Sequence, residues 1–217
     1  MDDLTGKRIV VTAGGTREAI DPVRYISNRS SGKMGYALAE AARDRGAKVI
    51  LVTAPTALPD PSGIEVVHIV SAVQMKEAVI KATAQADALI MAAAVADYQP
   101  KSAVKEKIKR QTAGAELILE LVRTPDILAE VKGNFIRVGF AAESEHLLEN
   151  ARDKLKRKNL DLIIANDITA PDSGFDVDTN KVTLIDRDGK LEDLPLMSKR
   201  EVADKILDRM VGMIGKR

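Results

Sequence analysis

Residues 8–16 read RIVVTAGGT, a run rich in β-branched residues that ends in two glycines. A short run that is apolar on both faces indicates a parallel strand covered by helices. Gly14 and Gly15 would then stand beyond the carboxyl end of a strand, where an open α/β sheet binds ligands. Glycines let backbone N–H groups approach a phosphate closely, but a tight strand-to-helix turn needs them equally. On these residues alone, both explanations stay open.

Similar apolar runs alternate with helical patterns along the chain, which predicts βαβ units. Strands are expected at residues 8–12, 48–53, 65–70, 88–92, 136–140 and 162–165. Helices are expected from residue 34, at 71–84, 125–132 and 146–158, and after a capping box at 198–201. We expect Ser30 or Ser31 to cap the first helix and Gly46 to end it. The prediction is a Rossmann-like α/β fold, with residues 1–217 as one domain doubly wound around a mainly parallel sheet.

Residues 171–194 break this alternation. The segment KVTLI at 181–185, a turn at 187–189 and Leu191 predict an antiparallel hairpin. Such a hairpin would extend a sheet edge or pair with another subunit, and we expect it to serve in dimerisation.

Composition excludes several classes of function. The chain has 33 basic and 32 acidic residues, a balance that argues against a general nucleic-acid or membrane binder. The absence of cysteine excludes disulfides, thiolate metal sites and a cysteine nucleophile. Only two histidines occur, so a Ser–His triad or a histidine metal site has little support, and we expect His68 to pack in the core. With no apolar run of about 20 residues and no recognisable secretory signal, we expect a soluble cytoplasmic protein.

Residues 21–35 read DPVRYISNRSSGKMG and place small and polar side chains around the start of the first helix. A helix N-terminus offers unpaired N–H donors and positive potential, and small residues leave room for a phosphate. Arg24 and Arg29 could pair with that phosphate. The density of these residues favours anion binding over a plain helix cap flanked by surface arginines.

Two further segments have a functional and a plain explanation. Residues 91–98 (MAAAVADY) put small residues after a strand, as if a ligand lay against the backbone, with Asp97 placed to accept its hydrogen bonds. Taken alone, close packing beside a turn aspartate explains them better. Residues 105–110 (KEKIKR) hold four cations, and Lys154, Arg157 and Lys158 share a helix face. Both sets could face a triphosphate, or could simply be solvated.

Seven segments, in this order, resemble the phosphopantothenoylcysteine synthetase family over nearly the whole chain. They are TAGGTREAIDPVRYISNRSSGKMG (12–35), AAVADY (93–98), EKIKR (106–110), TPDIL (124–128), VGFAAE (138–143), KNLDLIIAND (158–167) and GFDVDTNKV (174–182). The likeness is to the bacterial form that is often fused behind a flavin-dependent decarboxylase. This sequence lacks the decarboxylase half, so it is either a stand-alone ligase or an excised domain.

The resemblance implies a ligase of coenzyme A biosynthesis. The carboxylate of 4′-phosphopantothenate attacks the α-phosphate of CTP, which gives an acyl-cytidylate and pyrophosphate. The amine of L-cysteine then attacks the acyl carbon, which releases CMP and 4′-phosphopantothenoyl-L-cysteine. Mg²⁺ would arrive on the nucleotide, no protein metal ligand is assigned, and the active site would be shared across a homodimer. A fused or partner decarboxylase domain is a further implied partner.

Residue roles follow from the same resemblance. Asn28 and Lys107 look like the catalytic residues, one holding the acyl intermediate during cysteine attack and the other supporting activation at the triphosphate. Arg24 resembles an arginine that reaches the phosphopantothenate of the neighbouring subunit. Ala93, Ala94 and Asp97 resemble the wall of the substrate site. The expected nucleotide contacts are Gly14, Gly15, Thr16, Ser30, Gly32, Gly35, Asp97, Lys107, Pro125, Asp126, Ile127, Leu128, Phe140, Lys154, Lys158 and Asn166.

Two other functions compete with this interpretation. An NAD(P)-dependent dehydrogenase would need G-x-G-x-x-G after the first strand and an acidic residue after the second. The chain has Gly14-Gly15-Thr16 and Thr53-Ala54-Pro55 instead. A non-catalytic nucleotide-binding module would bind ligands without turnover. Pyrophosphate release that needs CTP, phosphopantothenate and Mg²⁺, but not NAD(P), would separate all three.

Overall fold

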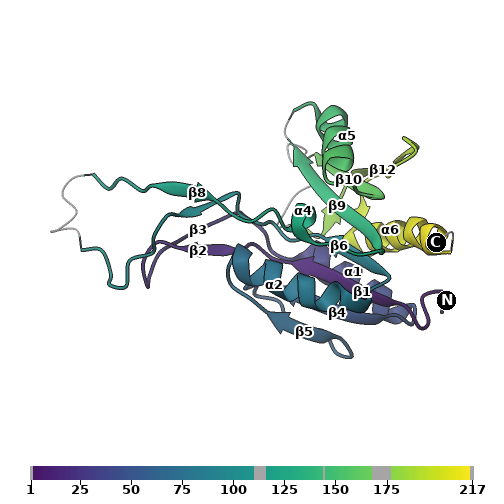
Figure 1. Cartoon of the computed structure of the whole chain (residues 1–217). Coiled ribbons are helices and arrows are strands. Elements are labelled where there is room, and N and C mark those ends of the chain that lie inside the picture. The colour runs from purple at the N-terminus through teal and green to yellow at the C-terminus, as the bar shows by residue number, and fades with distance from the viewer. Residues whose placement is uncertain (1, 110–115, 144, 168–176, 216–217) are drawn as a thin grey trace.

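The computed structural model describes residues 2–109, 116–143, 145–167 and 177–215; Arg110 and residues 171–176, which the sequence analysis singled out, lie outside them. An eight-stranded sheet runs in the order β13-β12-β10-β9-β6-β1-β4-β5 (Figure 1). Its six parallel strands are β1 (Arg8–Ala13), β4 (Lys48–Thr53), β5 (Glu65–His68), β6 (Ala88–Met91), β9 (Ile136–Glu143) and β10 (Leu162–Asp167). The antiparallel strands β12 (Val182–Asp186) and β13 (Leu191–Asp193) extend the β10 edge.

Helices cover both faces of this sheet, which explains why its strands are apolar throughout. On one face lie α1 (Lys33–Asp44) and α6 (Lys199–Ile214), packed on Ile9 and Val11 of β1. On the other lie α2 (Ala72–Ala82), the 3₁₀ turn η1 (Thr83–Gln85), α4 (Ile127–Glu130) and α5 (Leu147–Arg157). Val10 of β1 points to this second face because side chains alternate along a strand.

The predicted Rossmann-like doubly wound sheet is therefore confirmed, as is the antiparallel hairpin at its edge. The Ser198 capping box is also confirmed: the Ser198 hydroxyl accepts from Glu201 N and the Glu201 carboxylate accepts from Ser198 N. Two smaller expectations were wrong. The N-cap of α1 is Gly32, with no side-chain cap, and His68 is exposed at the edge strand β5, where Nε2 lies 3.0 Å from an Asp60 carboxylate oxygen.

A long arm extends away from the central sheet, and sequence analysis did not anticipate it (Figure 1). It combines the antiparallel pair β2 (Arg17–Ala19) and β3 (Tyr25–Ser27) with the pair β7 (Tyr98–Pro100) and β8 (Leu121–Arg123). β2 lies against β7, so two segments that are distant in sequence form one structure. A further small pair joins β11 (Thr179–Asn180) to β14 (Met197–Ser198) beside α6.

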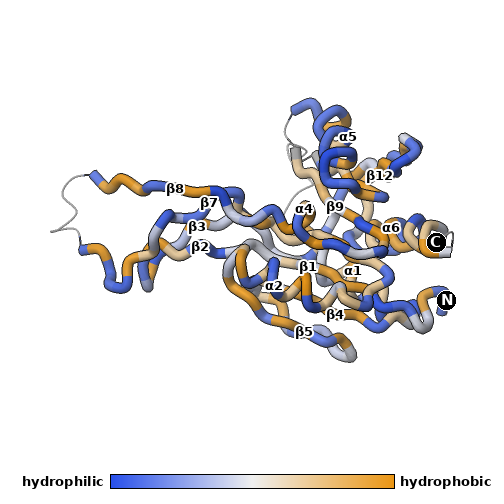
Figure 2. Tube along the Cα trace, viewed as in Figure 1, coloured by the Kyte–Doolittle hydropathy of each residue, from blue (hydrophilic) through white to orange (hydrophobic). Residues whose placement is uncertain are grey.

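Hydrophobic residues are concentrated in the sheet but also extend along the arm (Figure 2). The arm carries several large apolar side chains that stay exposed: Val23, Tyr25, Val104, Leu117, Ile118, Leu121 and Val122. Ile118 is 86% exposed. No helix within the described part of the chain is long and apolar enough to cross a lipid bilayer.

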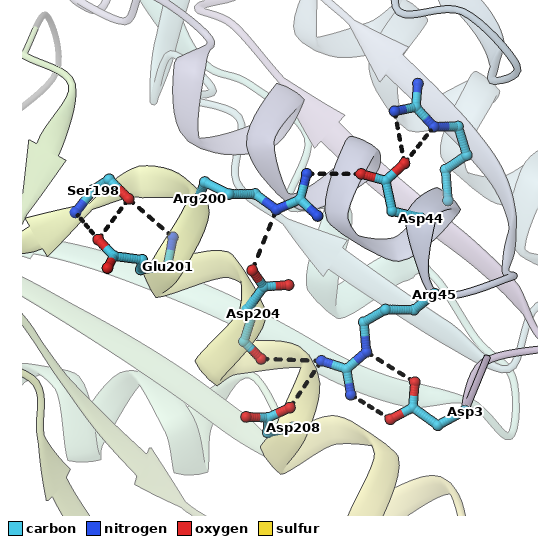
Figure 3. A network of polar contacts seen from close by, with 9 residues as sticks. Asp3, Asp44, Arg45, Ser198, Arg200, Glu201, Asp204 and Asp208 are labelled. Carbon is cyan, nitrogen blue, oxygen red and sulfur yellow. Dashed lines mark hydrogen bonds and ion pairs between the residues drawn. The ribbon is translucent and has the colours of Figure 1, made fainter. Parts of the chain in front are cut away.

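A charged network fastens the N-terminal segment and α1 to α6 (Figure 3). Arg45 donates through Nε and Nη2 to the two carboxylate oxygens of Asp3, and through Nη1 to Asp208 at 2.8 Å. Arg200 on α6 bridges Asp44 and Asp204. The Arg45 guanidinium lowers the pKa of Asp3 from its ordinary 3.8. The ends of the described chain are thus held together by ionised side chains.

We expect Arg45→Met to lower the free energy of unfolding at pH 7 by about 1–2 kcal/mol, because charge-assisted hydrogen bonds to Asp3 and Asp208 are lost. The Asp3 contribution is present above the ordinary carboxyl pKa and is lost as pH falls through the lowered folded pKa. The difference in the free energy of unfolding between the parent and Arg45→Met should therefore shrink below pH 3.8. Urea unfolding from pH 7 to pH 2.5 measures it, with Arg152→Met on α5 as the control. Equal stability of Arg45→Met and the parent at pH 7 would contradict the role of this network.

Candidate functional site

The candidate site lies where the winding of the sheet reverses. β1 pairs with β4 on one side and with β6 on the other, so the loops after β1 and β6 diverge at one sheet edge. Such a switch point, beyond the carboxyl ends of parallel strands, is where open α/β sheets bind ligands. The two loops remain joined there: Ala94 N donates to Gly14 O at 2.8 Å, and Thr16 N donates to Ala94 O at 3.2 Å.

Two buried threonines brace the loop after β6. The Thr12 hydroxyl accepts from Ala93 N at 3.1 Å, and the Thr16 hydroxyl accepts from Ala96 N at 2.9 Å. Both side chains are fully buried. The structure thus places Thr16 behind the loop, with its amide and hydroxyl both engaged, while Ala93 and Ala94 are only half-buried. Direct contact of Thr16 with a nucleotide stays a prediction.

Asn28 is held between the two loops. Its Nδ2 donates to Val95 O at 3.0 Å. Its backbone carbonyl oxygen lies so close to Gly15 that a Cβ added there would come within 2.6 Å of it. The predicted residues Gly14, Gly15, Asn28 and Ala94 are thereby brought together.

A cavity of about 280 Å³ opens at this point. Its lining residues are Gly15, Arg17, Tyr25, Ser27, Asn28, Arg29, Ser30 and Pro55. Arg17 was missed by sequence analysis, although its neighbours were singled out. Its guanidinium carbon lies 4.8 Å from the centroid of the Tyr25 ring, a cation–π arrangement that places a second arginine beside Arg29 in the cavity. The pairing of β2 with β3 brings Arg17 to the cavity. Strands of three residues leave no recognisable pattern in the sequence, so this position could not be predicted.

The N-terminus of α1 adjoins the cavity. Gly32, with φ of 80°, is the N-cap, and the first turn carries no acidic residue. Gly35 packs directly on β1, where an added Cβ would come within 2.6 Å of the Ala13 Cβ. The N-terminus of a helix carries positive potential, which favours a nearby anion. The structure thus places Ser30, Gly32 and Gly35 close together at this helix end, and phosphate binding by them stays a prediction.

Among the other predicted nucleotide contacts, Asp126 before α4 and Lys158 at the end of α5 are in contact with each other. Asp126 caps α4 by accepting from Ala129 N at 3.2 Å, and it forms an ion pair with Lys158. Phe140 is half-buried on the main core, Asn166 is nearly buried on β10, and Ile127 is buried in the core. Pro125, Leu128 and Lys154 are half-buried.

Lys107 lies exposed on the arm. Its neighbour Ile108 donates its N–H to Asp21 Oδ2 at 3.2 Å, while the Arg24 guanidinium donates to Ile108 O at 3.0 Å. Arg24, together with the amides of Val23 and Ile108, holds the pKa of the Asp21 carboxyl far below its ordinary value. Asp97 leads from the β6 loop into the arm, and its carbonyl oxygen accepts from Thr124 N at 3.0 Å.

Comparison with known proteins identifies the family. The model of the DNA/pantothenate metabolism flavoprotein C-terminal domain matches residues 4–213. The chain belongs to this family. The Coenzyme A biosynthesis bifunctional protein CoaBC of Bacillus subtilis (strain 168) is 50% identical over 214 residues, which are 97% of this chain and 52% of that protein. The chain therefore spans about half the length of this curated relative.

Solved structures similar to this chain support its membership of the family. A crystal structure of the C-terminal domain of CoaBC is 44% identical, with a TM-score of 0.85 and full coverage of both chains. A Cab2 mutant in complex with phosphopantothenate-cysteine is 18% identical, with a TM-score of 0.77 over 97% of this chain and 87% of that one, and shares the fold. The resemblance of the seven sequence segments is thus confirmed at the level of the family.

The described residues of this family member contain no group of three or more His, Asp or Glu side chains that could hold a metal ion. A Mg²⁺ ion used here would lean on phosphate oxygens, as Mg²⁺ commonly does at nucleotides.

We expect Gly15→Ala to destabilise the fold by about 1–3 kcal/mol, because its Cβ would overlap the Asn28 carbonyl oxygen and push Asn28 from Val95. Thermal unfolding and a crystal structure of the variant measure both effects. Gly212→Ala is the matched control, since a Cβ there meets nothing within 4 Å. This variant should gain about 0.5–1 kcal/mol of stability, because alanine loses less conformational freedom than glycine inside a helix. A Gly15→Ala variant as stable as the parent, with Asn28 unmoved, would refute the contact.

Proposed function

We propose that this domain forms the amide bond between 4′-phosphopantothenate and L-cysteine, with CTP as the activating nucleotide, in coenzyme A biosynthesis. The observation that carries the proposal is the cavity where Asn28, two arginines and the uncapped N-terminus of α1 meet at the switch point. Membership of the family adds support, since its CoaBC relative is a coenzyme A biosynthesis protein and a fold neighbour holds phosphopantothenate-cysteine.

Activation is the chemical reason for using a nucleotide. A carboxylate resists attack by an amine, so its oxygen first attacks the α-phosphate of CTP, forms an acyl-cytidylate and expels pyrophosphate. The cysteine amine then attacks the acyl carbon, loses a proton and expels CMP. Both steps require the reactants to be aligned and phosphate charge to be neutralised, which preorganised donors supply.

The cavity offers groups suited to both tasks. Ser30 and the cations Arg17 and Arg29 line the cavity and provide donors for phosphate oxygens, and the positive potential of the α1 N-terminus adds to them. Asn28 presents an amide side chain already oriented by Val95 O, which suits it to hold the acyl carbonyl. Lys107, reached from the arm, supplies a charge for the triphosphate. Mg²⁺ enters with CTP rather than as a resident ion.

The test of this function uses purified protein with CTP, phosphopantothenate, cysteine and Mg²⁺, scored by product mass. Pyrophosphate and an acyl-cytidylate should form without cysteine, and adding cysteine should give 4′-phosphopantothenoyl-L-cysteine and CMP. A panel with ATP, GTP and UTP tests the choice of CTP. Binding of CTP without pyrophosphate release would instead favour a nucleotide-binding module.

Asn28→Asp and Lys107→Gln should impair different steps. An aspartate would turn a carboxylate oxygen toward Val95 O and lose the donor, so cysteine coupling should fall by about a hundredfold while pyrophosphate release persists. Lys107→Gln removes a charge at the triphosphate, so pyrophosphate release itself should slow by at least about tenfold. Single-turnover assays separate the steps. Parental coupling by Asn28→Asp, or parental pyrophosphate release by Lys107→Gln, would remove that residue from the mechanism.

We further propose a homodimer whose active sites are shared. The predicted hairpin strand β12 buries Val182, Leu184 and Ile185 within its own chain, so these side chains are not available to a partner. The exposed apolar residues of the arm are available to a partner, and a patch of this kind is typical of a protein interface. Arg24 also lies on the arm and does not line the cavity of its own chain. A second copy packed on the arm would bring Arg24 to the partner's phosphopantothenate.

Mixing two defective variants tests this dimer. Arg24→Gln and Asn28→Asp chains should each be nearly inactive, whereas a mixture that exchanges subunits should recover activity, because one site per mixed dimer is intact. Ile118→Asp in both chains should abolish the recovery and shift sedimentation to the monomer. No recovery between chains shown to exchange, or a fully active monomer, would refute the shared site.

The length of the relatives suggests one more partner. This chain covers 52% of the Bacillus subtilis protein, so we propose that a fused or separate decarboxylase domain accompanies it and consumes the product. A cysteine amide with a free carboxylate is a suitable substrate for such a domain. The test is whether a flavoprotein co-purifies with this chain, or whether the same gene encodes a flavoprotein domain fused to it.

A further inference from the structure

Asp21 has two carboxylate oxygens with separate partners. The residue lies between β2 and β3, and its side chain has 0% exposed surface. Oδ1 accepts from the backbone N–H groups of Val23 at 2.9 Å and Arg24 at 2.8 Å, which closes the turn. Oδ2 accepts from Arg24 Nε at 3.0 Å, from Arg24 Nη2 and from Ile108 N at 3.2 Å.

Oδ2 thus ties the turn to a distant segment of the chain. Ile108 donates its N–H to Asp21 and accepts from the Arg24 guanidinium through its carbonyl oxygen at 3.0 Å. Val104 N also donates to Ile20 O at 3.0 Å. Ile108 is half-buried, whereas residues 101–107 and 109 are exposed. The segment around Lys107 is therefore fixed at the residue that follows the lysine.

We propose that Asp21 is the positioning residue for Lys107, and that it fixes Arg24 in the same unit. This inference rests on the proposed role of Lys107 in activation. The lysine side chain is long and flexible, and a charge aids the reaction only when its approach is confined. Anchoring the adjacent backbone confines the starting point of that side chain. The paired carboxylate keeps its charge, since its pKa lies far below the ordinary value.

The geometry predicts more than the loss of a fold contact. Asp21 holds a cation assigned to one substrate, Arg24, and the segment carrying a cation assigned to the other, Lys107. Both cations lie outside the cavity of their own chain. Disturbing Oδ2 should therefore slow activation, which uses both Lys107 and Arg24, more than the cysteine step, which uses Arg24 but not Lys107.

Asp21→Asn tests this division. The asparagine oxygen can still accept from Val23 and Arg24 amides, but its NH₂ group would face the donors of Ile108 and the Arg24 guanidinium. Pyrophosphate release without cysteine should slow by between about tenfold and a hundredfold. Cysteine coupling of acyl-cytidylate already formed should slow by no more than about fivefold, because this step needs Arg24 but not Lys107. Hydrogen exchange of the peptide containing Ile108 should quicken.

Asp161→Asn is the matched control. Asp161 is also a largely buried aspartate that accepts from a backbone amide, Arg137 N at 2.8 Å, and pairs with an arginine, Arg187. It should lower stability without separating the two steps or changing exchange at Ile108. Parental pyrophosphate release by a folded Asp21→Asn variant would overturn the proposal. So would equal slowing of both steps, which would show a general structural defect.

Ile108→Pro keeps the question answerable if Asp21→Asn does not fold. It removes the same N–H from the arm segment and leaves the carboxylate and the turn unchanged. It should reproduce the selective loss of pyrophosphate release, and a parental rate would overturn the proposal. If the parental chain itself releases no pyrophosphate, the proposed function fails and the positioning role with it. If the parent reacts and both variants match it, only the positioning role fails.

Discussion

The structure depends on the main-chain contact between the loops that leave β1 and β6. Two hydrogen bonds, Ala94 N to Gly14 O and Thr16 N to Ala94 O, continue the parallel pairing past the point where the strands should separate. The contact needs small residues, because an added Cβ at Gly15 would approach the Asn28 carbonyl oxygen to 2.6 Å. Gly15, first considered as a phosphate contact, is thus also required for packing. Gly15 takes part in this contact and also lines the cavity.

The arm follows from this contact. The chain leaving Thr16 becomes β2 and β3, and the chain leaving Asp97 becomes β7 and returns as β8. At the base, the Thr124 hydroxyl donates to Ala96 O at 2.5 Å and Thr124 N donates to Asp97 O. The loops that line the cavity and the strands that form the arm are therefore continuous. A rigid scaffold that presents functional loops at one sheet edge is a common way to position a site.

Charge is distributed locally in a chain that is almost neutral. The arginines of the cavity, Arg17 and Arg29, lie near the N-terminus of α1, so positive potential gathers at one place. Other charges are paired: Lys158 with Asp126, Arg24 with Asp21, and Arg45 with Asp3 and Asp208. Net charge describes the partners that the whole surface attracts, but an anion site needs only a few donors in one cavity.

The sequence by itself determined the layers of the fold and the family. Runs such as RIVVT and KVILVT are short and apolar on both faces, which is a local property typical of a covered parallel strand. The Ser198 capping box and the edge hairpin are equally local, and the motif order carried the family. The arm could not be predicted from the sequence, because β2, β3, β7 and β8 are only three residues long and β2 packs against β7, which is far away in the chain. Three further features depend on the tertiary structure: Arg17 lines the cavity, Asn28 donates to Val95 O, and Ile108 N donates to Asp21. Each joins residues that no local periodicity relates.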